Sequence, residues 1–212
     1  PFDYQNNCLV LSFKDIPAPN APGHTDQLHE AILECVVAAE GRTMVLFTSY
    51  ASLKLATQAL RDRLNAEGIR LQSQGLDGSA DRLTQLLRNE ENLVVFGTAA
   101  MWEGVDVPGP ALSQIVMVRL PFPSPVDPIH SARSDEFDNP FIEYSLPKAI
   151  LRFRQGFGRL IRGENDRGVF TILDSRFVNA RYGSEFAGIL PDTEMGNATI
   201  ADAGNTIRRW LN

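Results

Sequence analysis

The chain has 212 residues, of which 43% are apolar and 22% are charged, and its formal net charge is -6. This composition is typical of a folded globular protein and excludes an intrinsically disordered chain. The acidic balance argues against nucleic-acid binding by the whole surface, because phosphate contacts are made by clustered Lys and Arg side chains. Residues 148–176 differ, with seven basic and three acidic side chains. We therefore expect a basic stripe on an acidic body.

The chain carries no sign of a membrane or secreted protein. Its longest apolar runs, such as 115–118, are far shorter than the roughly 20 residues that cross a bilayer, and no signal-peptide pattern opens it. Cys8 and Cys35 lack the spacing of a disulfide framework or a zinc site. We expect a cytoplasmic protein with no membrane partner. The start at Pro1 rather than Met predicts a fragment of a longer polypeptide.

Short β-branched runs alternate with amphipathic helical windows, which is typical of an α/β fold with a mainly parallel sheet and helices on both faces. The expected strands are 9–12, 44–48, 69–72, 93–96, 114–118 and 168–173. The expected helices are 26–39, 52–66, one capped by Ser79 that ends near 89, 147–161, and a terminal helix over 200–211. Gly41 and Gly68 are placed to end the first two helices. Five prolines and several acids after residue 120 predict a surface excursion over 121–146.

The second expected strand ends in two hydroxyls and an aromatic ring, Thr48, Ser49 and Tyr50. Open α/β sheets bind ligands at the carboxyl ends of their strands, so these side chains are positioned for phosphate or sugar contacts. Alternatively, Ser49 or Ser52 caps the helix that follows. Both interpretations remain open at the level of the sequence.

The loop after the fourth expected strand contains three glycines, a tryptophan and two carboxylates within fourteen residues. Gly97 would allow a backbone to approach closely, and Thr98 would donate to a phosphate. Glu103 and Asp106 would contact a ribose hydroxyl or a basic partner. Trp102 is either a loop anchor or a base-stacking platform. So many special residues favour a functional loop.

The most informative segment is 155–162, with the sequence QGFGRLIR. Each glycine inside a helix costs roughly 1 kcal/mol relative to alanine, so helix stability does not explain this composition. Residues three apart share one helical face, so Arg159 and Arg162 are predicted to point two guanidinium groups at one polyanion. The alternative is a solvated basic face. Asp174 and Arg176 further along would orient these arginines or pair with each other at the surface.

The sequence offers arginines for a nucleotide phosphate but no loop that would hold the nucleotide. It has no G-x-x-x-x-G-K-[ST] segment and no Asp-Glu pair after a strand of the kind that holds magnesium. This combination predicts a partner domain.

These segments resemble the second RecA-like domain of superfamily two helicases, in the DinG-like branch related to XPD. Residues 47–50 resemble helicase motif IV, 97–109 motif V and 155–162 motif VI, with agreeing flanks around 120–128 and 146–152. The resemblance implies a three-layer RecA-like fold. One departure is Met101, where the family commonly has an aromatic residue.

The resemblance also implies a mechanism in which ATP lies between two RecA-like domains. The first domain, on the same polypeptide, would hold ATP, Mg²⁺ and any iron–sulfur cluster, and single-stranded DNA would cross both domains with 5′→3′ polarity in DNA repair or recombination. The implied roles are arginine fingers at Arg159 and Arg162, nucleotide sensing by Gln155, nucleotide contacts by Glu103, Gly104 and Asp106, and DNA contacts by Ser49, Tyr50, Thr98 and Trp102.

Two alternatives remain. A non-catalytic nucleic-acid-binding or regulatory module would keep the fold but would not need both Arg159 and Arg162. A stand-alone enzyme for a small nucleotide would need a phosphate loop, which the sequence lacks. The helicase hypothesis further predicts that this chain does not hydrolyse ATP by itself.

Overall fold

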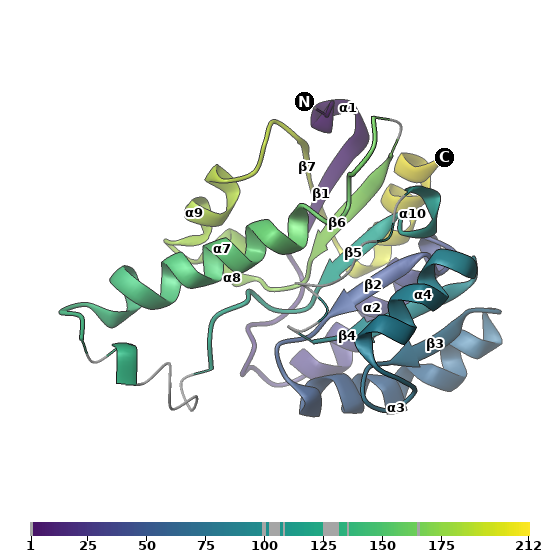
Figure 1. Ribbon diagram of the computed structural model, residues 1–212, viewed down its shortest axis with the longest axis horizontal. Helices are drawn as coiled ribbons and strands as arrows, with labels where there is room; N and C mark the ends of the chain where they lie inside the picture. Colours follow the sequence, from purple (N-terminus) through teal and green to yellow (C-terminus); the bar gives the residue numbers. More distant parts are fainter. Residues whose placement is uncertain are drawn as a thin grey trace.

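The computed structural model of the protein describes residues 2–98, 101, 107, 109–124, 132–134, 136–164 and 166–212. Its strands form one seven-stranded sheet in the order β3-β4-β2-β5-β6-β1-β7, and every pair of neighbours is parallel (Figure 1). The strands are β1 (Cys8–Phe13), β2 (Thr43–Leu46), β3 (Arg70–Ser73), β4 (Leu93–Gly97), β5 (Gln114–Met117), β6 (Gly168–Ile172) and β7 (Glu194–Ala198).

All six strands expected from the sequence are present, within two residues at each end. The sequence did not predict β7, which pairs with β1 at one edge of the sheet, Leu9 opposite Glu194. Its residues are mostly exposed and include no β-branched or aromatic side chain. The strand therefore gives no hydrophobic signal of its own, and its pairing depends on the buried neighbour.

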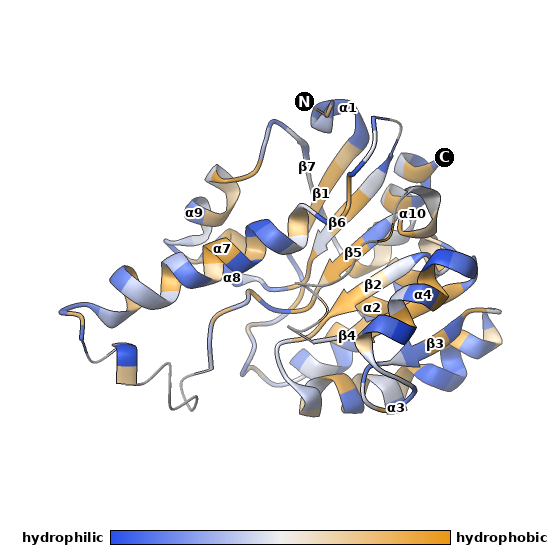
Figure 2. Cartoon of the chain, in the orientation of Figure 1, coloured by the Kyte–Doolittle hydropathy of each residue, from blue (hydrophilic) through white to orange (hydrophobic). Residues whose placement is uncertain are grey.

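Alternate residues of each strand face two separate cores, so that Val45 lies in one and Met44 in the other. Helices α2 (His24–Ala38), α3 (Tyr50–Ala66) and α10 (Ile200–Leu211) cover the first face, and α4 (Ala80–Asn89), α7 (Leu146–Phe157) and α9 (Gly183–Gly188) cover the second. Figure 2 shows hydrophobic strands between helices of mixed hydropathy. The arrangement confirms the predicted three-layer α/β fold.

The helix boundaries on the first face follow from local chemistry. Gly41 and Gly68 follow α2 and α3 with φ of 81° and 74°, in the left-handed region that favours glycine. The terminal helix α10 runs unbroken through Gly204, where a Cβ atom would lie 3.2 Å from the carboxylate of Glu34 on α2. Glycine there allows α10 to pack closely on α2. Both predicted helix stops and the terminal helix are confirmed.

The prediction of a helix over 147–161 is wrong at its end, because α7 stops at Phe157. Beyond it, the N–H groups of Arg159 and Leu160 donate to carbonyls only three residues back, at 3.3 and 3.1 Å, which is a tight turn. Arg159 and Arg162 therefore do not share a helical face. Two glycines weaken the helix, and Leu160 leaves it to pack on Gly168, where a Cβ atom would lie 2.7 Å from Leu160 Cδ1.

Around the segment expected as a surface excursion, the described residues include the π-helical turn η2 (Phe141–Ser145), which leads directly into α7. Phe122 stacks on Phe141 with ring centroids 5.7 Å apart and also meets Tyr182 edge-on at 5.4 Å. Ile142 is 52% exposed. Three short elements complete the described chain, α1 (Tyr4–Asn7), η1 (Gly109–Ala111) and α8 (Arg176–Asn179).

Within the described ranges, no helix is long and apolar enough to cross a membrane. Cys8 and Cys35 are both buried and unbridged. Burial raises the pKa of the Cys8 thiol to about 12, so this thiol stays protonated and unreactive at neutral pH.

Candidate nucleotide and nucleic-acid sites

Several polar residues flagged in the sequence gather at the carboxyl edge of the sheet. Ser49 and Tyr50 follow β2, and Thr98 follows β4, the neighbouring strand. Because both strands are parallel, their exits open on the same edge. The structure therefore brings together residues that are almost 50 positions apart in the sequence.

Ser49 is the N-cap of α3. Its Oγ atom accepts a hydrogen bond from the N–H of Ser52 at 3.2 Å, so the capping interpretation is confirmed. Ser49 and Tyr50 are also exposed, and Tyr50 is 55% accessible. One edge of its ring lies against Gly75, where a Cβ atom would approach Tyr50 Cε1 to 3.3 Å. The ring is thus supported and still open to a ligand.

Thr98 is buried and is held by a residue that the sequence analysis missed, Gln74 at the end of β3. The side-chain Oε1 of Gln74 accepts the Thr98 N–H at 2.8 Å and the Thr98 hydroxyl at 3.1 Å. Since the hydroxyl proton is used in this bond, it is not offered to a phosphate in this arrangement. The Nε2 amide of Gln74 donates to no other described residue. β3 has the mixed sequence RLQS, so no apolar run in the sequence pointed to the residue that follows it.

The remaining residues of the motif V loop, Trp102, Glu103, Gly104 and Asp106, lie outside the described residues. Met101 is described and is fully buried. It fills the space above Gly97, where a Cβ atom would come within 2.5 Å of Met101 Sδ. Gly97 is therefore needed for the approach of a side chain, rather than of a backbone as the sequence analysis expected.

Gln155, Arg159 and Arg162 lie at the opposite end of the sheet. Gln155 is exposed in the last turn of α7, and the two arginines are half-buried in the turn that follows. Since Leu160 packs on Gly168, the first residue of β6, this turn lies at the amino edge. We call residues 158–163 the arginine turn. The structure separates it from the hydroxyls of the carboxyl edge by the length of the strands.

The arginine turn is fastened by a carboxylate that the sequence analysis did not single out. Asp166 Oδ2 accepts the backbone N–H groups of Arg162 at 2.9 Å and Gly163 at 2.8 Å. The start of β6 is also held in place, because Trp210 Nε1 on α10 donates to the Gly168 carbonyl at 3.0 Å. These contacts fix the backbone that carries the guanidinium groups. The signal in the sequence was an acidic residue four positions after Arg162.

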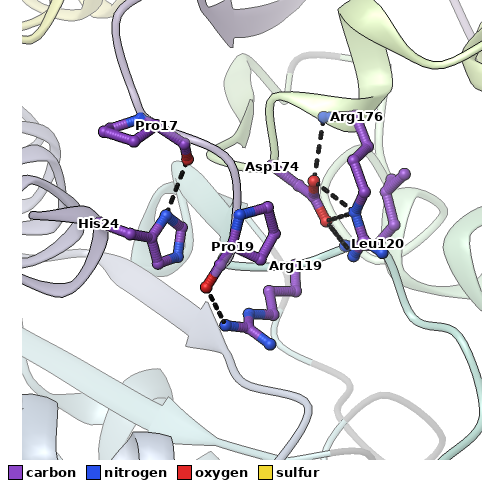
Figure 3. Close-up of polar contacts among 7 residues, drawn as sticks. All are labelled: Pro17, Pro19, His24, Arg119, Leu120, Asp174 and Arg176. Atoms are coloured by element: carbon purple, nitrogen blue, oxygen red, sulfur yellow. Dashed lines mark hydrogen bonds and ion pairs between the residues drawn. The ribbon is translucent and has the colours of Figure 1, made fainter. Parts of the chain in front are cut away.

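Asp174 and Arg176 pair with each other at the exit of β6, as one of the two interpretations proposed (Figure 3). The expectation of a surface pair is wrong for Asp174, whose side chain is fully buried. It accepts from Arg176 at 2.6 Å and from the backbone N–H of Leu120 at 2.9 Å. Burial acts to raise the pKa of Asp174, but the Arg176 hydrogen bonds and charge and the Leu120 bond outweigh it, so its pKa lies below the ordinary value. The ionised pair ties the exits of β5 and β6 together.

None of the described residues form a group of three or more His, Cys, Asp or Glu side chains that could hold a metal ion. The described residues therefore provide hydroxyl, amide and guanidinium groups rather than a metal site.

The architecture defines a RecA-like α/β fold. The fold is similar to that of an XPD helicase, with a TM-score of 0.68 over 91% of this chain and 36% of the other, at 17% identity. It is also similar to the C-terminal domain of the DEAD-box protein Dbp5, with a TM-score of 0.57 over 97% and 98% of the two chains, at 15% identity.

Sequence comparison identifies the family. Residues 32–193 match the family model of the helicase C-terminal domain. The chain is 39% identical to the ATP-dependent helicase DinG of Mycobacterium tuberculosis over 90% of its length, and 36% identical to the ATP-dependent DNA helicase YoaA of Escherichia coli over 90%. It is 36% identical to the 3′-5′ exonuclease DinG of Bacillus subtilis over 95%. The chain therefore belongs to the helicase C-terminal domain family, in its DinG-like branch.

The chain spans only part of these relatives. It covers 23% of the Bacillus subtilis protein, 29% of the Mycobacterium tuberculosis protein and 30% of the Escherichia coli protein.

Proposed function

We propose that this chain is the second motor domain of an ATP-dependent DNA helicase and that Arg159 and Arg162 act on ATP bound by a first RecA-like domain of the same polypeptide. The observation that carries the proposal is the arginine turn, in which Asp166 fixes the backbone beneath two half-buried arginines, in a chain of this family. Such a turn offers permanent positive charge at a defined position. That is what a developing phosphate charge requires.

In the proposed reaction, water attacks the γ-phosphorus of ATP, and the bond to the β–γ bridging oxygen breaks to give ADP and phosphate. Arg162 and Arg159 donate N–H groups to the γ-phosphate oxygens and stabilise the charge that develops there. An arginine finger of this kind contributes a factor of about 10³–10⁵ in rate. Because Asp166 holds the turn before ATP arrives, little reorganisation is needed at the moment of reaction. Gln155, exposed on α7, senses the nucleotide.

The phosphate loop and the Mg²⁺ site are assigned by this proposal to the first domain, and Glu103, Gly104 and Asp106 complete the nucleotide contacts from this side. An iron–sulfur cluster, where the parent protein has one, also belongs to the first domain. Residues 1–212 alone are then expected to show no ATP turnover.

The proposed single-stranded DNA track crosses the carboxyl edge of the sheet. Tyr50 offers an exposed ring that is supported by Gly75, and a base stacked on such a ring contributes about 1–3 kcal/mol. Ser49 and Trp102 add further contacts. Thr98 takes part in the proposed track by holding the side chain of Gln74, whose Nε2 amide donates to no other described residue and offers two N–H groups to the strand. ATP-driven closure and opening of the two domains moves the strand with 5′→3′ polarity, and the work serves DNA repair or recombination.

The test uses the longest natural polypeptide that carries this sequence. Its ATP turnover is measured with and without single-stranded DNA, together with Arg162→Ala and the control Arg63→Ala, which removes an exposed pair between α3 and Glu30 of α2. We expect DNA to stimulate turnover, Arg162→Ala to abolish the stimulated rate, and Arg63→Ala to retain it. DNA binding without turnover in the unaltered polypeptide would contradict the proposal and favour a binding module.

A further inference from the structure

After β2 and β5, two neighbouring strands in the middle of the sheet, the chain continues to helices on opposite faces. From β2 the chain continues into α3, which belongs to the first core, whereas the helix after β5 is α7, which belongs to the second. Because β2 and β5 are neighbours, their exits form a topological switch point at the carboxyl edge, and we call the space outside these two exits the β2–β5 crevice. Open α/β sheets bind ligands at such a switch point. No motif identified in the sequence covers the β5 side of this crevice.

One basic residue lies at that point, Arg119. The β2–β5 ladder pairs Leu46 with Met117, and Val118 N–H donates to the Leu46 carbonyl at 3.1 Å. Thr48 and Arg119 each follow the last paired residue of their strand, Leu46 and Met117, by two positions. An exposed hydroxyl and a half-buried guanidinium group therefore flank the crevice from its two strands.

Arg119 is held through the backbone of the next residue and through its own side chain (Figure 3). The next residue, Leu120, donates its backbone N–H to buried Asp174 at 2.9 Å. The Nη2 atom of Arg119 donates to the carbonyl of Pro19 at 3.2 Å, and the loop of Pro19 is itself fixed by a 2.8 Å bond between His24 Nδ1 and the Pro17 carbonyl. The guanidinium group is thus positioned without any ligand.

The charge of Arg119 is not balanced by its described surroundings. Among the described residues it forms no ion pair, and its one hydrogen bond uses one of five N–H donors. Asp174, the carboxylate that holds the adjacent Leu120 N–H, is already paired with Arg176. A fixed guanidinium group with unused donors, beside a hydroxyl, is suited to bidentate contact with a phosphate.

We propose that the crevice between β2 and β5 is a phosphate-binding site for a nucleic-acid strand, formed by the Arg119 guanidinium group and the Thr48 hydroxyl. This inference rests on the proposed function, because it requires the strand to cross the carboxyl edge. Arg119 contacts the backbone and not the bases. Its contribution is therefore independent of sequence and depends on salt.

The experiment measures the affinity of the full polypeptide for a fluorescently labelled oligothymidylate over a range of KCl concentrations. For Arg119→Gln we expect binding to weaken several-fold at low salt, and the slope of log affinity against log salt to fall by about 0.7, the value of one single-strand phosphate contact. Arg119→Lys keeps a positive charge and should restore most of the slope. The matched control Arg63→Gln removes a charge far from the crevice and should leave the slope unchanged.

The competing account is that Arg119 only fastens the Pro19 loop. It predicts that Arg119→Gln lowers the unfolding midpoint and leaves the salt slope at its original value, and this result would overturn the inference. A changed KM for ATP with an unchanged DNA slope would equally overturn it, by assigning Arg119 to the nucleotide. If DNA stimulates turnover normally but the slope does not move, only this inference fails. If the unaltered polypeptide binds no oligothymidylate, the proposed function fails with it.

Discussion

The two edges of the sheet present polar groups in different ways. At the carboxyl edge two pairs of side chains bond to each other, Thr98 with Gln74 and Asp174 with Arg176. At the amino edge, the hydrogen bonds described for Asp166 go to the backbone of the arginine turn. The first edge is therefore a rigid surface built from paired side chains. The second is a fixed backbone that carries two charged side chains.

This difference indicates how each edge would work. A rigid surface suits a strand that must be held in one register as it crosses the domain, whereas long arginine side chains on a fixed backbone suit a ligand that arrives on another domain. The variants below break one edge at a time, and each has a different expected readout.

The largest expected effect on stability comes from the buried pair of the carboxyl edge. Arg176→Gln leaves the Asp174 carboxylate buried with only part of its hydrogen bonds. We expect the free energy of unfolding to fall by about 3 kcal/mol, the lower end for a broken buried pair, since the Arg176 side chain is 35% exposed. Urea denaturation measures it, and Arg63→Gln should change stability by less than about 1 kcal/mol. If Arg176→Gln and Arg63→Gln lowered the free energy of unfolding equally, the claim that the buried pair stabilises the fold more than an exposed pair would be contradicted.

The same pair predicts an acid dependence. The folded-state pKa of Asp174 is lowered, so its contribution is fully present above the unfolded pKa of about 3.9 and is lost as pH falls through the folded value. The unfolding free energy should therefore decline below about pH 4 by more in the unaltered protein than in Asp174→Asn. Parallel pH profiles for the two proteins would be inconsistent with a lowered pKa at Asp174.

The amino edge is broken by Asp166→Ala, which removes both hydrogen bonds to the arginine turn. A displacement of about 1 Å at a catalytic group costs about 10² in rate, so we expect kcat for ATP to fall about 100-fold with KM nearly constant. Asp166→Asn keeps one acceptor oxygen and should recover part of kcat. Steady-state kinetics of the full polypeptide decides, and an unchanged kcat in Asp166→Ala would show that the turn does not need its carboxylate.

Gln74→Ala removes the side chain that holds Thr98 at the carboxyl edge, where the DNA is proposed to bind. It leaves the Thr98 N–H and hydroxyl buried without their acceptor, which should lower the free energy of unfolding by about 2 kcal/mol and weaken DNA binding. Gln72 on β3 is the matched control, because the hydrogen bond described for its side chain goes to the neighbouring carbonyl of Leu71. If Gln72→Ala were as damaging as Gln74→Ala, the Thr98 contact would have no special importance.

The smallest expected effect separates the two roles of Ser49. Ser49→Ala removes the cap of α3 and should cost about 1 kcal/mol. Ser49→Asp retains a capping oxygen but places a negative charge where the DNA backbone is proposed to pass. Thermal unfolding should then be near normal in Ser49→Asp, while DNA affinity falls. Normal affinity in this variant would leave Ser49 with the cap alone.

Most strands of the sheet could be predicted, because they are apolar runs bounded by turn residues. Such runs identify a strand from local sequence. The end of α7 could not, since Leu160 leaves the helix to pack on Gly168, a contact across the fold. β7 gave no signal because an exposed edge strand needs no apolar pattern.

The residues of the candidate site also divide into those that local sequence reveals and those that only the fold reveals. The hydroxyls and arginines lie in recognisable segments, so they could be named from sequence. Asp166 was missed although its partners lie only three and four positions away, whereas Gln74 and Arg119 could not be named, because their partners lie 24 and 100 positions away. Such contacts exist only once the chain has folded.

The central claim is that the amino edge serves ATP and the carboxyl edge serves DNA. The most direct test measures kcat for ATP at saturating single-stranded DNA, and the Kd for that DNA, in the full polypeptide carrying Arg162→Ala or Gln74→Ala. We predict that Arg162→Ala lowers kcat by about 10³-fold or more and leaves Kd within about twofold, whereas Gln74→Ala raises Kd and leaves kcat at saturating DNA largely intact. A loss of DNA affinity in Arg162→Ala with kcat preserved would contradict the account.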